Sequence, residues 1–123
     1  MAKGVLIVDD ALFMRVTLRR ILEQAGIAVA GEAVNGEEAV RMYTEVSPSA
    51  VLLDITMPVM DGLEAARQIL ARDPHAMIVM CTALGQQDIL KEAVTIGVRD
   101  YIVKPFQPDR VVESIRNVMQ VTG

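Results

Sequence analysis

The sequence predicts an α/β fold in which a five-stranded parallel sheet is covered by helices on both faces. Short runs rich in branched aliphatic residues alternate five times with segments of helical periodicity. Such an alternation is typical of parallel sheets with right-handed crossover connections. The 123 residues suffice for one domain with a substantial core and are too few for two. We therefore expect residues 1–123 to form a single domain.

Five apolar runs are the predicted strands. Apolar side chains at successive positions indicate strands that are covered on both faces, as in a parallel sheet. These runs lie at residues 5–8, 28–30, 51–53, 77–80 and 101–103.

The segments between these runs are predicted helices, because their apolar residues recur at intervals of three and four. Gly26 and Gly97 follow the first and fourth of them, as expected for helix C-termini. Pro108 precedes the last one, which is typical of a helix start. The helices are predicted at residues 14–25, 36–46, 62–72, 86–96 and 111–119.

Composition and charge exclude several classes of partner. The net charge is −4 and no basic run occurs, so nothing indicates binding to nucleic acid or to an anionic membrane. No apolar run approaches the roughly 20 residues that a membrane span needs, and the N-terminal run is too short for a signal peptide. The single cysteine, Cys81, is expected to be a buried thiol. We expect a cytoplasmic monomer.

Three aspartates follow the ends of two predicted strands. Asp9 and Asp10 come directly after the first strand, and Asp54 comes directly after the third. In a doubly wound sheet with the strand order 2-1-3-4-5, the first and third strands are neighbours, and ligands bind beyond their carboxyl ends. Clustered carboxylates repel one another unless a cation holds them together, and oxygen ligands suit Mg²⁺. Alternatively, Asp10 simply caps the first helix.

The fourth and fifth predicted strands also end in polar residues. Thr82 ends the fourth strand and offers a hydroxyl donor, and Lys104 ends the fifth and offers a cation. Each residue alone is ordinary. Together with the three aspartates, they place groups that suit a phosphoryl and metal site at the ends of four strands.

The chain resembles the receiver domain of two-component response regulators over essentially its whole length. The resemblance implies a flavodoxin-like (βα)₅ three-layer sandwich. Three segments are most similar to stand-alone chemotaxis regulators of the CheY type: Phe13-Met14-Arg15, Ala83-Leu84-Gly85-Gln86-Gln87 and Lys104-Pro105-Phe106-Gln107-Pro108. The matching motifs are Val8-Asp9-Asp10, Leu53-Asp54-Ile55-Thr56-Met57-Pro58 with Asp61-Gly62, Thr82-Ala83 and Lys104-Pro105-Phe106.

The resemblance implies a role for each site residue. Asp54 would be the nucleophile that accepts a phosphoryl group from a sensor histidine kinase, with Lys104 neutralising charge. Asp10, Asp54 and the main-chain oxygen of Thr56 would ligate Mg²⁺ directly, and Asp9 would act chiefly through a water. The Lys104–Pro105 peptide bond would be cis.

The resemblance also implies how phosphorylation is signalled. Thr82 would move toward the phosphoryl group, and Tyr101 would turn inward into the space that it leaves. The face formed by the fourth helix, fifth strand and fifth helix would change and dock an output protein. A flagellar motor switch protein is the expected target, and a phosphatase is a further candidate partner.

Three alternatives stay open at this point. A phosphorelay protein of the sporulation or cell-cycle type would have the same motifs. A Mg²⁺-dependent phosphatase of the haloacid dehalogenase type also uses a strand-end aspartate, but it needs a second acid where this chain has Thr56. A flavin-binding module would need a phosphate-binding loop after the first strand, where Asp9 and Asp10 stand.

Overall fold

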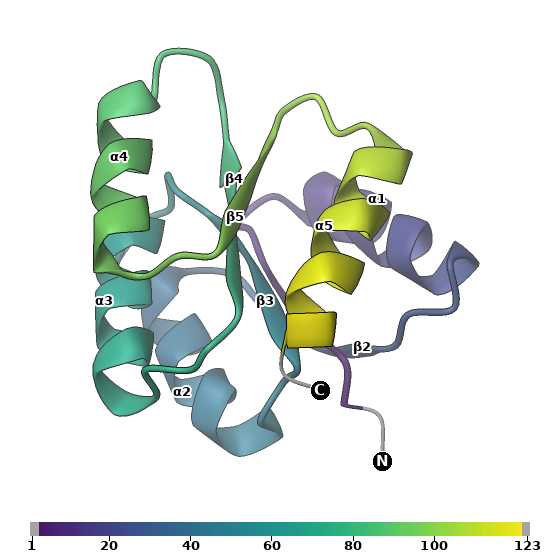
Figure 1. Ribbon diagram of the computed structural model, residues 1–123, viewed down its shortest axis with the longest axis horizontal. Helices are drawn as coiled ribbons and strands as arrows, with labels where there is room; N and C mark the ends of the chain where they lie inside the picture. The colour runs from purple at the N-terminus through teal and green to yellow at the C-terminus, as the bar shows by residue number, and fades with distance from the viewer. Residues whose placement is uncertain (1–2, 122–123) are drawn as a thin grey trace.

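The computed structural model describes residues 3–121, which form the predicted five-stranded parallel sheet in the order β2-β1-β3-β4-β5. Strands and helices alternate along this part of the chain (Figure 1). The strands are β1 (Val5–Val8), β2 (Val29–Ala33), β3 (Ala50–Asp54), β4 (Ile78–Thr82) and β5 (Asp100–Val103). The helices are α1 (Leu12–Gln24), α2 (Gly36–Val46), α3 (Gly62–Arg72), α4 (Gln87–Ile96) and α5 (Pro108–Val121).

The sheet is the middle of three layers. Helices α2, α3 and α4 cover one face, and α1 and α5 cover the other (Figure 1). Successive residues of a strand point to opposite faces, so Leu6 and Val8 pack in the core under the first group, while Val5 and Ile7 pack under the second. Burial on both faces explains why this strand is apolar throughout, and it confirms the predicted fold class.

The strand bounds differ from those predicted mainly at the carboxyl ends. β2 extends to Ala33 and includes the charged Glu32, because this edge strand is only partly buried and tolerates a polar residue. β3 and β4 include Asp54 and Thr82 themselves. Hydrophobicity alone places the end of β3 before Asp54, although the backbone of Asp54 continues the sheet, whereas Thr82 ends β4 as predicted.

The helix predictions agree with the structure to within three residues at each end, and two helix starts have clear local causes. Helix α1 covers 12–24 rather than 14–25, and α5 covers 108–121 rather than 111–119. Helices α2 and α3 have the predicted bounds, since the side chains of Asn35 and Asp61 accept hydrogen bonds from the first turns. Helix α4 begins one residue later than predicted, with Gln86 in the cap position. None of the helices within residues 3–121 is long and apolar enough to cross a bilayer.

Candidate functional site

The three predicted aspartates lie together at the carboxyl edge of the sheet. β1 and β3 pair in register with Val8 opposite Leu53, so Asp9, directly after β1, and Asp54, the last residue of β3, lie at the ends of neighbouring strands. Side-chain oxygens of Asp9, Asp10 and Asp54 all lie within 4.8 Å of one another. Asp9 and Asp54 are buried, with exposed fractions of 1% and 6%, and Asp10 is exposed. We call this cluster the acid pocket; it confirms the predicted convergence.

The turn after β1 aims these aspartates. Oδ1 of Asp9 accepts a hydrogen bond from the backbone amide of Ala11 at 2.9 Å. Helix α1 has Ala11 at its cap position and no side-chain cap. The interpretation of Asp10 as a helix cap is therefore wrong, because the preceding aspartate makes the local bond and leaves Asp10 at the open side of the pocket.

Lys104 reaches the acid pocket from β5. Its Nζ atom lies 3.0 Å from Oδ1 of Asp54 and 3.6 Å from Oδ2 of Asp9. The backbone amide of Lys104 donates to the carbonyl of Thr82 at 2.7 Å, which continues the pairing of β4 and β5. The Lys104–Pro105 peptide bond is cis, as the resemblance implies.

Burial and charge shift the ionisation of this pair. Burial raises the pKa of Asp54, and repulsion from Asp9 and Asp10 adds to this rise, although the Lys104 hydrogen bond opposes it. Burial disfavours the charged form of Lys104, but its hydrogen bond to Asp54 and the charges of Asp54 and Asp9 raise its pKa overall. The pocket thus holds more negative charge than one lysine balances.

The residues of the pocket fit a hard divalent cation. Oδ2 of Asp9 is buried and has no hydrogen-bond partner among residues 3–121, and the Lys104 ammonium at 3.6 Å is beyond hydrogen-bonding distance. A buried acceptor without a partner is costly, which a bound cation would relieve. All three side chains offer oxygen ligands, the kind that Mg²⁺ prefers. Asp9, Asp10 and Asp54 could therefore hold such an ion.

Thr82 ends β4 next to the strand that carries Asp54, and Tyr101 lies on the following strand, β5. The Thr82 hydroxyl is 3.4 Å from the carbonyl of Ile102, and Tyr101 is 42% exposed. A cavity of about 220 Å³ lies between them, with Leu90 and Val103 in its lining. The two predicted switch residues thus line one cavity, which leaves space between them.

Several residues that no sequence motif indicates also make hydrogen bonds around the acid pocket. Arg15 donates to the carbonyl of Asp9 at 2.8 Å and to Glu32 at 3.0 Å, and Arg19 donates to Glu32 at 2.8 Å. Gln86 bonds both Ala83 and Thr56. Single polar residues on helices look like solvent-exposed residues in a sequence, so only the packing of α1 on β2 and of α4 on β4 reveals these contacts.

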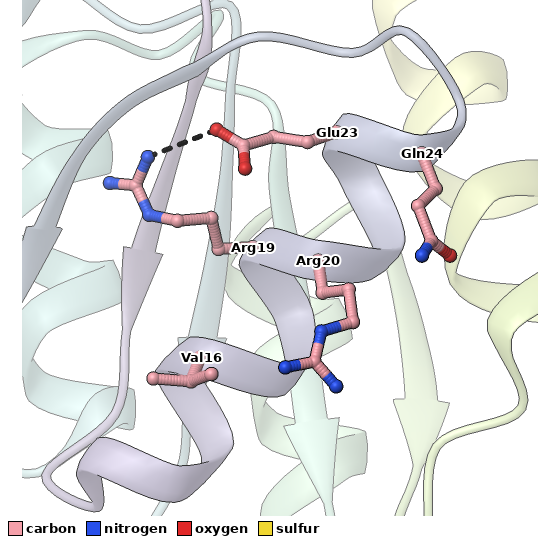
Figure 2. Close-up of a pocket in the computed structure, with 5 residues that line it drawn as sticks. All are labelled: Val16, Arg19, Arg20, Glu23 and Gln24. Carbon is pink, nitrogen blue, oxygen red and sulfur yellow. Dashed lines mark hydrogen bonds and ion pairs between the residues drawn. The ribbon is translucent and has the colours of Figure 1, made fainter.

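A hollow of about 390 Å³ on the outer side of α1 is a poorer candidate site. Figure 2 shows its lining, in which Arg19 pairs with Glu23 at 3.2 Å. Val16, Arg20 and Gln24 complete the lining, and all five residues come from one helix. The hollow is open, and its one acid is paired, so the unbalanced charge of the acid pocket distinguishes the latter as the functional centre.

The fold and the site define a class of protein: a doubly wound domain with an aspartate cluster and a lysine at its switch point. The model of the response regulator receiver domain family matches residues 5–116, and the chain belongs to this family. Membership decides against the phosphatase and flavin alternatives.

Curated relatives and a solved structure agree with this assignment. The chain is 54% identical over 118 residues to the chemotaxis protein CheY of Thermotoga maritima, covering 96% of this chain and 98% of the relative. It is 50% identical over 119 residues to CheY of Bacillus subtilis, covering 97% and 99%. The CheX–CheY–BeF₃–Mg complex of Borrelia burgdorferi aligns with a TM-score of 0.89 and 36% identity, covering 94% and 88%. The chain is thus a receiver domain of the CheY type.

Proposed function

We propose that this chain is a phosphorylation-activated response regulator whose phosphoacceptor is Asp54. The observation that carries the proposal is the contact of a buried strand-end carboxylate with Lys104 inside a cluster of acids. An oxygen of Asp54 attacks the phosphorus of a kinase phosphohistidine. The phosphorus–nitrogen bond breaks, and its electron pair goes to the imidazole. An ionised carboxylate needs no general base for this attack.

The acid pocket would hold Mg²⁺ for this transfer. Asp10, Asp54 and the main-chain oxygen of Thr56 are the proposed direct ligands, with Asp9 acting chiefly through a water. When bound, the ion supplies positive charge that offsets the charge of the phosphoryl oxygens. Lys104 supplies a second positive charge to Asp54, so the protein contributes mostly positioning and electrostatic stabilisation.

Thr82 and Tyr101 would convert phosphorylation into a change of the α4-β5-α5 face. The exposed ring of Tyr101 and the 220 Å³ cavity beside Thr82 support this, because the ring has space to enter. A hollow of about 480 Å³ on the same face supports docking of an output protein. Leu90, Lys91, Val94 and Tyr101 are among the residues that line it.

The similarity to CheY proteins favours chemotaxis as the process. The upstream partner would be a sensor histidine kinase, and the downstream partner a flagellar motor switch protein. A partner similar to CheX is a further candidate, and a phosphatase remains a predicted one. A phosphorelay intermediate of the sporulation or cell-cycle type is the alternative. We further propose that residues 1–123 act as one cytoplasmic domain.

Mass spectrometry tests the phosphoacceptor. Incubation with acetyl phosphate and Mg²⁺ should add about 80 Da to the protein, in a form that base removes. The adduct should be absent from Asp54→Ala and strongly reduced without Mg²⁺. Asp88→Asn, which changes an exposed acid on α4, should label like the unmodified protein. Labelling of Asp54→Ala at the unmodified level would contradict the proposal.

Partner binding separates chemotaxis from a phosphorelay. Purified motor switch protein should bind this chain more tightly with BeF₃⁻ and Mg²⁺ than without them. Preferential binding to a phosphotransfer protein, with no response to the motor protein, would favour the phosphorelay alternative.

A further inference from the structure

The side chain of Gln86 joins the two loops that follow β3 and β4. Its Oε1 atom accepts a hydrogen bond from the backbone amide of Ala83 at 2.7 Å. Its Nε2 atom donates to the hydroxyl of Thr56 at 3.1 Å. Ala83 directly follows Thr82, and Thr56 lies two residues after Asp54. One amide therefore connects the segment after the phosphoacceptor to the segment after the switch threonine.

Helix capping does not account for this side chain. Gln86 occupies the cap position of α4, where a side chain normally accepts a hydrogen bond from the first turn of the helix. It makes no such bond. Both polar ends of the amide are instead engaged with the loops, so the contact ties α4 to the edge of the acid pocket.

The bonds of Gln86 belong to the arrangement in which Tyr101 is exposed and the cavity beside Thr82 is open. In this arrangement the Thr82 hydroxyl lies near the carbonyl of Ile102, and Tyr101 is exposed. Gln86 also lines the cavity between Thr82 and Tyr101. A shift of Thr82 toward Asp54 moves the adjacent Ala83 amide, which either breaks its bond to Gln86 or pulls the first turn of α4 along.

We propose that Gln86 is a positioning residue that holds the loop after β4 in its resting place and opposes activation. The inference rests on the proposed function, because it concerns the same site. An interaction present in only one of two states shifts the equilibrium toward that state by its own free energy. Removal of the Gln86 bonds therefore favours the activated arrangement and lowers the concentration of phosphoryl mimic that is needed to reach it.

The test is a titration with BeF₃⁻ at saturating Mg²⁺, followed by NMR through the backbone amide of Tyr101. Gln86→Met keeps the length of the side chain and removes both bonds, and Thr56→Val removes the bond between the two side chains. Gln86→Met should lower the half-saturating concentration about three- to tenfold. The double variant Gln86→Met/Thr56→Val should have the same half-saturating concentration as Gln86→Met alone. Gln24→Met, at an exposed glutamine on α1 that lies outside both bonds, should titrate like the unmodified protein.

A second readout comes from Ala83 itself. Its amide should exchange with solvent faster in Gln86→Met than in the unmodified protein without BeF₃⁻, because its acceptor is gone. An unchanged titration midpoint, an unchanged exchange rate, or full additivity of the two single variants would each overturn the role of Gln86. A lack of response to BeF₃⁻ in the unmodified protein would instead refute the proposed function, so the two failures are distinguishable.

Discussion

The Nζ atom of Lys104 lies 3.0 Å from Oδ1 of Asp54, although the two residues are 50 positions apart in the chain. Three adjacent parallel strands produce this contact, because β3, β4 and β5 all end at the same edge of the sheet. The bond from the Lys104 amide to the Thr82 carbonyl sets how far along the edge the lysine lies. The resulting ion pair favours ionisation of Asp54, whose burial and acidic neighbours oppose it.

Replacement of Lys104 by methionine should slow phosphorylation of Asp54 by acetyl phosphate at least tenfold. The reason is that a positioned donor to a charged group in a transition state typically contributes about 100-fold or more. The rate of mass increase measures the effect at fixed Mg²⁺. Lys91→Met, on the exposed side of α4, is the matched control and should react at the unmodified rate. Equal rates for the Lys104 and Lys91 variants would show that Lys104 takes no part in the transfer.

Asp54→Asn should make the metal-free protein more stable at neutral pH. The folded state raises the pKa of Asp54, so the free energy of unfolding falls as pH rises from the unfolded value of about 3.9 through the folded pKa. Above that pKa the full cost of the charge is present. Asparagine has no charge to bury in the pocket, so we expect a higher urea midpoint for Asp54→Asn than for the unmodified protein.

Added Mg²⁺ should stabilise the unmodified protein more than it stabilises Asp54→Asn. A cation that binds only the folded protein stabilises it, and the loss of one carboxylate ligand weakens that binding. The melting temperature of the unmodified protein should therefore rise more with added Mg²⁺ than that of Asp54→Asn. Equal rises in the two proteins would place the bound ion away from Asp54.

The carboxylate of Glu32 should make the stability of the protein depend on pH in acid. Burial alone would raise its pKa, but hydrogen bonds from Arg19 and Arg15 lower it overall. A lowered folded pKa adds stability that is fully present above the unfolded value of about 4.3 and is lost as pH falls through the folded pKa. Glu32→Gln should cost about 1 kcal/mol at pH 7, a value that allows for partial exposure.

Urea unfolding at pH 7 and at pH 3 tests whether the charge of Glu32 stabilises the protein. The difference in urea midpoint between the unmodified protein and Glu32→Gln should shrink as the carboxylate takes up its proton. Glu45→Gln, which removes an exposed ion pair with Arg41, should change the midpoint little at either pH. A constant difference across this range would mean that the contribution of Glu32 does not come from its charge.

Val59→Asn should stabilise the protein by up to about 1 kcal/mol. Val59 has φ of 69° in the loop after β3, a left-handed conformation that is unfavourable for a β-branched residue and more accessible to asparagine. Its side chain is 76% exposed, so the substitution removes little buried apolar surface. The melting temperature measures the effect. Val34→Asn, at an exposed valine without positive φ, should not raise it.

Several parts of the site were predictable from local patterns. Three carboxylates directly after two apolar runs, in a chain that alternates strands and helices, are expected to meet once the strand order is 2-1-3-4-5. The order itself came from the general behaviour of doubly wound sheets and from the resemblance. The starts of α2 and α3 were equally predictable from the sequence, because the side chains of Asn35 and Asp61 accept hydrogen bonds from backbone amides only three residues later.

Other features depended on contacts between elements that are distant in sequence. The bonds of Arg15 to Glu32 and of Gln86 to Thr56 join residues 17 and 30 positions apart. Such pairs carry no periodicity, so a sequence pattern cannot reveal them.

Residue order along the chain was thus enough to decide that five strands alternate with five helices and that acids and a lysine stand at strand ends, because hydrophobic burial follows a short, regular period. The folded arrangement alone decided which oxygen of Asp9 stays without a hydrogen-bond partner, and which side chain bridges the loops beside Asp54. Those outcomes depend on distances of a few ångströms between separate elements, which only the packing of helices on the sheet sets.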